Sequence, residues 1–100
     1  MDGYFQHSWP MTVAFRFIVR GVVQGVGFRW FVVKRARLLG VSGWVRNQAD
    51  GSVEVFAQGA GKALDALESD LAAGPPRSDV ARVEREDKVP EARLTGFDVH

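Results

Sequence analysis

The sequence predicts an α+β sandwich, an antiparallel sheet with two helices on one face. Some segments alternate apolar and polar residues, others repeat apolar residues every three or four positions, and their order is strand, helix, strand, strand, helix, strand. The 100 residues suffice for one domain with one core. A hydrophobic content of 46% with 25% charged residues is typical of globular proteins.

The first strand and first helix flank a glycine-rich turn. From Thr12 onward the apolar residues of one strand face are Val13, Phe15, Phe17 and Val19. Arg16, Ile18 and Arg20 occupy the other face. The strand is interrupted at Gly21, Gly25 and Gly27. A helix then follows with apolar residues at Phe28, Val32, Ala36 and Leu39, and Gly40 is a suitable C-terminal stop.

The pattern in the middle of the chain predicts a β-hairpin. A second strand is expected over residues 41–48 and a third over 52–58, joined at the turn signal Asp50-Gly51. In the third strand Val53, Val55 and Ala57 share one face.

The last third predicts a helix and two strands. Leucines at positions 64, 67 and 71 predict a helix that ends before Gly74-Pro75-Pro76. A fourth strand is expected within residues 78–88. Because Val80 and Val83 are three residues apart, we expect a bulge or an edge position there. Phe97 and Val99 suggest a short last strand.

This order of elements has a consequence for function. Each strand–helix–strand unit is a crossover, so the first two strands run in the same direction with another strand between them. The glycine-rich turn and Asn47, at the end of the second strand, are therefore expected at one edge of the sheet.

The turn from Gly21 to Arg29 has the features of an anion cradle. A helix N-terminus presents backbone N–H groups without intrahelical partners, and glycines let a ligand approach them closely. Arg29 adds a planar fork of donors suited to a phosphate. On residue types alone, a plain tight turn with a surface arginine is an equal alternative. The run matches neither a dinucleotide fingerprint nor a nucleotide P-loop.

Composition excludes several other classes of site. The chain has no cysteine, so disulfides, thiolate metal sites and thiol nucleophiles are excluded. His7 and His100 lie at opposite ends, and no histidine pair has metal-ligand spacing. A net charge of +1 does not favour nucleic-acid binding. The acidic residues 84, 86 and 87 alternate with basic ones, as on a solvated edge.

Two motifs carry a resemblance to a known family. Residues 21–29, Gly-Val-Val-Gln-Gly-Val-Gly-Phe-Arg, closely resemble the signature of the acylphosphatase family. Residues 43–47, Gly-Trp-Val-Arg-Asn, with Asp-Gly-Ser-Val-Glu at 50–54, resemble a second element of it. The resemblance extends over about residues 11–99, and two spaced motifs are more specific than one.

The resemblance implies a ferredoxin-like α/β sandwich that hydrolyses acyl phosphates to a carboxylate and inorganic phosphate without a metal or cofactor. Arg29 matches the phosphate-binding arginine, and Asn47 matches the asparagine that positions water. The matching backbone cradle comprises Gln24, Gly25, Val26, Gly27 and Phe28. One departure is Gln48, which follows Asn47 where the family commonly has a hydroxyl residue.

Some alternatives stay open. A non-catalytic module of the same fold could bind an anion, or could bind RNA on an open face carrying Ile18, Trp44 and Phe56. Carbamoyl-phosphate chemistry within a larger maturation system is a narrower alternative. Trp30, Trp44 and Phe31 could contact an acyl group or only pack the sheet, and packing is the expected role of each.

The remaining expectations concern the chain as a whole. Residues 1–10 show no periodicity and are expected to form a loosely ordered tail before a domain at 11–100. The N-terminus lacks the pattern of a secretory signal, and no apolar run is long enough for a membrane span. We therefore expect a cytoplasmic monomer that binds a small acyl phosphate and neither nucleic acid nor a membrane.

Overall fold

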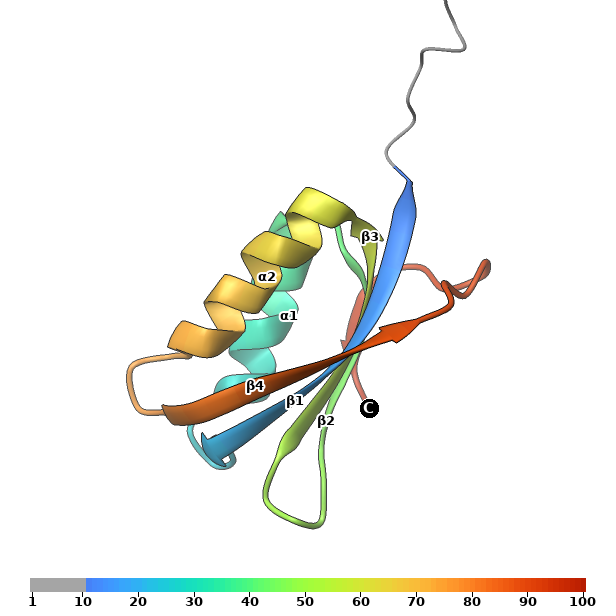
Figure 1. Cartoon of the computed structure of the whole chain (residues 1–100). Helices are drawn as coiled ribbons and strands as arrows, with labels where there is room; N and C mark the ends of the chain where they lie inside the picture. Colours follow the sequence, from blue (N-terminus) through green and yellow to red (C-terminus); the bar gives the residue numbers. More distant parts are fainter. Residues whose placement is uncertain (1–10) are drawn as a thin grey trace, which may run out of the picture.

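The computed structural model describes residues 11–100, so the predicted tail at 1–10 lies outside the described residues. The predicted elements are present in the predicted order (Figure 1). The strands are β1 (Thr12–Val22), β2 (Ser42–Asn47), β3 (Val53–Ala60), β4 (Asp79–Lys88) and β5 (Phe97–Val99). The helices are α1 (Phe28–Leu38) and α2 (Gly61–Ala73), each ending close to its predicted glycine stop.

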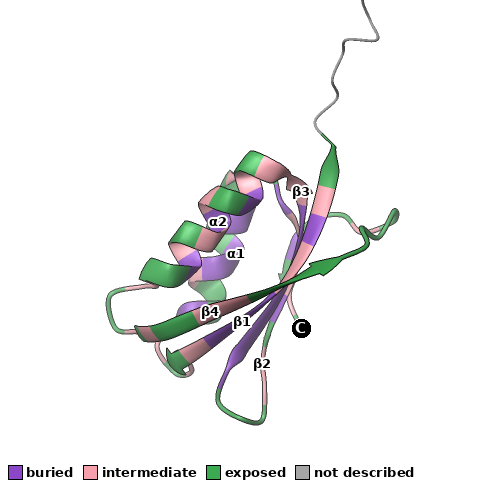
Figure 2. Cartoon of the chain, in the orientation of Figure 1, coloured by how far each residue is buried: buried purple, intermediate pink, exposed green. Residues whose placement is uncertain are grey.

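The core lies between the sheet and the helices. The inward residues of the central strands, among them Phe17, Val19 and Val55, are fully buried. They pack in one cluster with Leu64 and Leu67 of α2 and with apolar residues of α1. In Figure 2 the buried residues lie on the central strands and at intervals along both helices. The alternation of β1 and the leucine spacing of α2 thus follow from one shared core.

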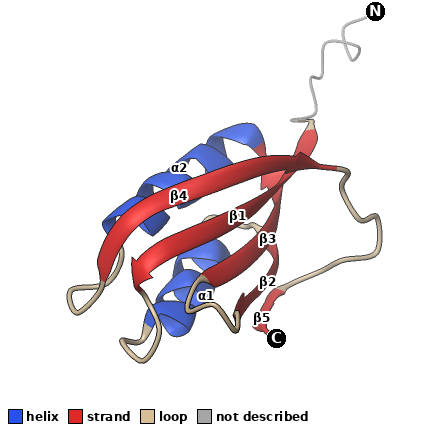
Figure 3. Cartoon of the chain, turned by 60° about the horizontal axis from the view of Figure 1, so that its bottom comes forward, coloured by secondary structure: helices blue, strands red, loops and turns tan. Residues whose placement is uncertain are grey.

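The sheet order is β4-β1-β3-β2-β5, and both helices cover the same face (Figure 3). β1 and β2 are both antiparallel to β3, so they run in the same direction with β3 between them, as predicted. The last strand changes one detail of the prediction. β5 pairs with β2 in parallel, so the sheet is mixed and not wholly antiparallel. Residues 89–96 cross along one end of the sheet, which turns β5 against the direction of β4.

β4 occupies an edge and carries the predicted irregularity. Its register with β1 shifts where Arg20 pairs with Arg82 and Gly21 pairs with Val80. A Cβ on Gly21 would lie 2.2 Å from the carbonyl oxygen of Asp79. Gly21 has a φ of 132°. A glycine is therefore required here because the β4 backbone approaches so closely, and not because of the turn that follows.

The open face of the sheet carries a buried charge cluster. The Glu54 side chain is only 5% exposed and accepts hydrogen bonds from Arg16 and Arg46. Burial raises the pKa of Glu54, but the hydrogen bonds from the two arginines outweigh it and leave that pKa lowered. Glu54 is therefore ionised at neutral pH and binds β1 and β2 to β3. Within residues 11–100, no helix has the length and apolar character of a membrane span.

Candidate active site

The turn between β1 and α1 presents free backbone donors. Gly25 and Gly27 have positive φ angles of 74° and 78°, and a Cβ on either would meet no atom within 4 Å. Gly27 is the N-cap of α1, and no side chain caps this helix end. The first N–H groups of α1 therefore face an open space, where the helix dipole adds partial positive charge. This geometry suits an anion.

Strand register places Asn47 beside this turn. Val53 of β3 pairs with Val19 of β1 on one side and with Asn47 of β2 on the other. Neighbouring strands lie about 4.8 Å apart, so Asn47 is about 10 Å across the sheet from Val19, three residues before the end of β1. It shares its strand face with buried Val45, which is the face that the helices cover. Asn47 thus lies near the N-terminus of α1, as the topology predicted.

A small pocket of about 70 Å³ forms at this junction. It is lined by Val23, Gly25, Gly27, Phe28, Arg29, Trp30 and Asn47. The structure therefore gathers Arg29, Asn47 and three of the predicted cradle residues around one space. Gln24 and Val26 are not among the lining residues, and Val26 packs against the core instead.

Arg29 and Asn47 both have unused hydrogen-bonding capacity. Arg29 is exposed and makes no ion pair or side-chain hydrogen bond within the described chain, whereas Arg20 is bonded to Glu84 and Asp50. The Oδ1 atom of Asn47 is buried and has no partner among residues 11–100. Buried polar atoms are nearly always hydrogen-bonded, so an unpartnered one beside a pocket is a candidate contact for water or ligand.

The neighbours of Asn47 leave its amide free. The side chain of Gln48, the residue that departs from the family pattern, bonds to Ser52 and Glu54. Hydrogen bonds from the Ser52 hydroxyl and backbone N–H lower the pKa of Asp50 to about 2. Asp50 is therefore a structural anion of the hairpin loop, and it does not line the pocket.

One lining residue differs from the sequence expectation. For Trp30 the sequence favours packing over contact with an acyl group. It is 63% exposed and lines the pocket, so packing does not account for its position. Phe31 is half-buried against the core, which agrees with packing. Neighbouring helix positions point in different directions, and only the docking of α1 decides which one reaches the pocket.

Neither a carboxylate nor an imidazole is among the residues that line this pocket. Within the described residues, no group of three or more histidine, aspartate or glutamate side chains is arranged to hold a metal ion. The polar chemistry available from the lining is therefore hydrogen bonding from backbone amides, one guanidinium, one carboxamide and one indole N–H.

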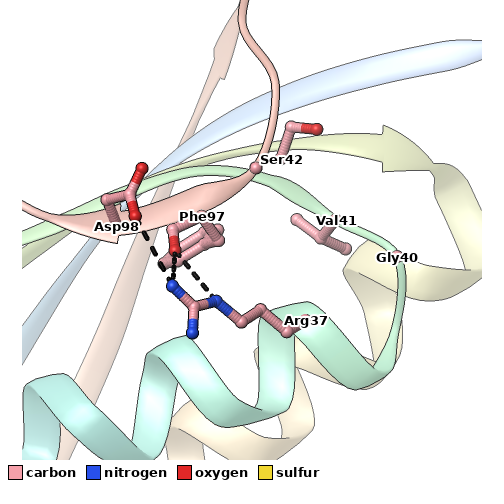
Figure 4. Close-up of a pocket in the computed structure, with 7 residues that line it drawn as sticks. Arg37, Gly40, Val41, Ser42, Phe97 and Asp98 are labelled. Atoms are coloured by element: carbon pink, nitrogen blue, oxygen red, sulfur yellow. Dashed lines mark hydrogen bonds and ion pairs between the residues drawn. The ribbon is translucent and has the colours of Figure 1, made fainter.

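A larger pocket, of about 320 Å³, lies at the other end of α1 (Figure 4). Its one arginine, Arg37, already donates to the backbone carbonyl of Phe97 at 3.0 and 3.2 Å and lies 3.5 Å from the Asp98 carboxylate. Figure 4 shows these bonds joining α1 to β5. None of the predicted site residues lines this pocket. The Arg37 guanidinium is already hydrogen-bonded to β5.

Comparison with known proteins identifies the family. Residues 15–99 match the sequence model of the acylphosphatase family. The chain belongs to the acylphosphatase family. An acylphosphatase of Koribacter versatilis is 54% identical over 82 residues, which cover 82% of this chain and 74% of the relative. The acylphosphatase of Bacillus subtilis has a solved structure with 36% identity and a TM-score of 0.85, covering 90% of this chain and 99% of the other.

Another match is to part of a much longer protein. T. kodakarensis HypF is 30% identical with a TM-score of 0.78, and the match covers 88% of this chain but 12% of HypF. The similarity is therefore to one part of that protein.

The family assignment confirms three predictions: the acylphosphatase resemblance, the ferredoxin-like fold and the enzyme class. The chain is an acylphosphatase by family, hence a hydrolase of small acyl phosphates. The open sheet face fits the RNA-binding alternative poorly, because Ile18 and Phe56 are each only 6% exposed. Trp44 is stacked between Phe56 and His100, with ring centroids 6.1 and 5.2 Å away.

Proposed function

We propose that the pocket at the N-terminus of α1 hydrolyses the carboxyl-phosphate bond of acyl phosphates, with Arg29 and backbone amides binding the phosphoryl group and Asn47 positioning water. One observation carries this assignment. A guanidinium and a carboxamide, both without partners in the described chain, line one small pocket at an uncapped helix N-terminus. The cradle would use N–H groups from residues 24–28.

The proposed reaction needs only placement and charge stabilisation. A water oxygen attacks phosphorus, the bond between phosphorus and the acyl oxygen breaks, and the acyl group leaves as a carboxylate. The phosphoryl oxygens carry negative charge through the transition state, where preorganised N–H donors and Arg29 stabilise it. The pocket lining holds no base, so the water proton passes to a phosphate oxygen, and the products are carboxylate and inorganic phosphate.

Asn47 has the chemistry that water positioning requires. A carboxamide both donates and accepts hydrogen bonds, so it can hold a water molecule without taking its proton. Its buried Oδ1 is free to accept such a bond. Fixing the nucleophile in line with the leaving group lowers the entropic part of the barrier.

The test compares two arginines of one helix. Arg29→Ala is expected to lower kcat/KM for benzoyl phosphate at least about a hundredfold, and Asn47→Ala about a hundredfold to a thousandfold. Arg35→Ala is the matched control, because Arg35 is also exposed on α1 but lies over the Phe31 ring at 5.3 Å. It should keep wild-type activity. Full activity of Arg29→Ala would contradict the site assignment, and loss of activity in a chelator would contradict metal independence.

A cytoplasmic location, a monomeric state and the absence of nucleic-acid or membrane partners stay predictions. Size-exclusion chromatography with light scattering tests the monomer directly.

A further inference from the structure

The Gln24 side chain is directed away from the pocket. Its Nε2 atom donates two hydrogen bonds, one to the backbone carbonyl of Gln48 at 2.8 Å and one to that of Ser52 at 2.9 Å. Gln24 is a residue of the glycine-rich turn, and its two acceptors belong to the hairpin between β2 and β3. The Gln24 carboxamide therefore joins the phosphate cradle to the β2–β3 hairpin.

The two acceptors lie on either side of the hairpin base. Gln48 directly follows Asn47, and Ser52 directly precedes Val53, which pairs with Asn47. The backbone N–H of Gln48 also donates to the Ser52 carbonyl at 2.9 Å, which closes the hairpin. Gln24 thus holds both chain segments one residue beyond Asn47.

Asn47 depends on this support because its own side chain has none. Its Oδ1 has no partner among the described residues, and Gln48 directs its amide toward Ser52 and Glu54. The distance between the Asn47 amide and the cradle is therefore governed by the backbone at the end of β2. Of the predicted cradle residues, Gln24 alone has a side chain that bonds to this backbone.

We propose that Gln24 is a positioning residue, which fixes Asn47 relative to the phosphate cradle by clasping the base of the β2–β3 hairpin. This inference rests on the proposed function of Arg29 and Asn47. It adds a role for the Gln24 side chain, while the Gln24 backbone N–H stays part of the proposed cradle.

The chemistry of the clasp requires a neutral amide. A single nitrogen must supply two N–H donors to two carbonyl oxygens, which glutamine does. A carboxylate of the same shape would face both carbonyl oxygens without a proton and would repel them. A protonated carboxyl group could restore one of the two bonds. Gln24→Glu therefore perturbs the clasp with almost no change in volume.

The first experiment separates positioning from phosphate binding. With benzoyl phosphate near pH 7.5, Gln24→Glu is expected to lower kcat about tenfold to a hundredfold, because small misplacements of reacting groups have effects of this size. The inhibition constant of inorganic phosphate should stay within about twofold, since Arg29 and the amides are unchanged. A raised inhibition constant with unchanged kcat would overturn the proposal and assign Gln24 to binding.

Gln58→Glu is the matched control. Gln58 is likewise a glutamine whose Nε2 donates to a backbone carbonyl, that of Glu91 at 2.9 Å. This bond ties β3 to the 89–96 segment, away from the pocket. The same substitution should therefore cost stability at both positions but lower kcat only at Gln24. An equal loss of kcat in both variants, tracking their loss of stability, would refute a positioning role.

Two further readouts exclude a merely structural effect. As pH falls from 7.5 toward 5, the ratio of wild-type to Gln24→Glu kcat should decrease, because the substituted carboxyl group gains a proton. Arg20 and Asp50, the charged pair that meets at the same hairpin, are present in both proteins and affect both alike. A ratio constant over this range would contradict the clasp.

In the Asn47→Ala background, Gln24→Glu should lower kcat by no more than about twofold, because residues that act through one another are not additive. An undiminished effect in that background would show that Gln24 acts independently of Asn47. If Asn47→Ala alone keeps full activity, the proposed function fails instead, so the two failures are distinguishable.

A second inference concerns the acyl half of the substrate and rests on separate observations. The pocket is small, about 70 Å³, and its guanidinium, carboxamide and backbone donors are assigned to the phosphoryl group and water. The acyl group is therefore expected beside the remaining large exposed side chain at the pocket, that of Trp30. Trp30 lines the pocket and is 63% exposed. We infer that Trp30 contacts the acyl group and favours flat, apolar acyl phosphates.

The test compares two substrates. Trp30→Ala is expected to lower kcat/KM about tenfold for benzoyl phosphate and less than twofold for acetyl phosphate, which has little surface to contact the ring. Leu38→Ala, at an 81% exposed position at the end of the same helix, should change neither. Equal changes for both substrates, or none, would overturn this inference. Inactivity of the wild-type protein on both substrates would overturn the proposed function.

Discussion

Replacing Asn47 by alanine should lower activity without lowering stability. The Asn47 side chain has no hydrogen-bond partner in the described chain, but it holds the attacking water in the proposed transition state. The Oδ1 atom is buried without a hydrogen bond. The folded protein therefore carries the cost of a desolvated acceptor that only water or substrate relieves. Such a cost at a functional site is the expected origin of a trade-off between activity and stability.

The magnitude follows from this one atom. A buried acceptor without a partner costs about 1–3 kcal/mol, and alanine removes it. Part of the gain is lost with the packing of a half-buried side chain, so we expect the free energy of unfolding to rise by between 0 and about 1 kcal/mol. The melting temperature should then stay unchanged or rise by up to about 4–8 °C. Activity should fall about a hundredfold to a thousandfold.

The assay is urea unfolding of Asn47→Ala beside kcat measured on benzoyl phosphate. Ser52→Ala is the control from the same hairpin. Ser52 is 2% exposed, and its hydroxyl bonds to Asp50 and Gln48 at 2.6 and 2.9 Å. Removing a satisfied hydroxyl should cost about 1–2 kcal/mol. If Asn47→Ala instead destabilised the protein by as much as Ser52→Ala, the amide would have a structural partner, and the reasoning would be wrong.

Three further predictions concern backbone and charge. Gly25→Ala and Gly40→Ala, at φ 74° and 70° with open space around a Cβ, should each lose about 1–2 kcal/mol of stability, but only Gly25→Ala should weaken inhibition by phosphate. Gly43→Ala should prevent folding or cost more than about 3 kcal/mol, as judged by circular dichroism, because a Cβ there would meet the Phe56 carbonyl oxygen. The lowered pKa of Glu54 means that its stabilisation is complete above its ordinary value of 4.5 and is lost as pH falls through the lower folded value. In urea titrations below pH 4.5, Glu54→Gln should therefore lose less stability than the wild type.

Much of the fold and part of the site could be predicted from local patterns. The alternation around Phe17 and the leucine spacing around Leu67 identify their elements because each must present an apolar stripe to a single core. The crossover rule then brings Asn47 to the edge that carries the glycine-rich turn, and strand register agrees. The two spaced motifs identified the family for a similar reason, since each is a local run of residues.

Contacts between distant segments could not be predicted in this way. The sequence pattern assigns Gly21 to the turn, but a glycine is required at this position because β4 approaches so closely. β5 reads as a strand, and only the path of residues 89–96 makes it parallel to β2. Periodicity describes which face a residue occupies. It contains no information on which strand will lie alongside or how closely.

The sequence by itself determined the order of elements, the family and the residue types around the phosphate turn, because each depends on neighbours along the chain. The tertiary structure alone decided the direction of the Gln24 side chain, the missing partner of Asn47 Oδ1 and the exposure of Trp30 at the pocket. These properties depend on hydrogen-bond geometry and burial between segments that only packing brings together.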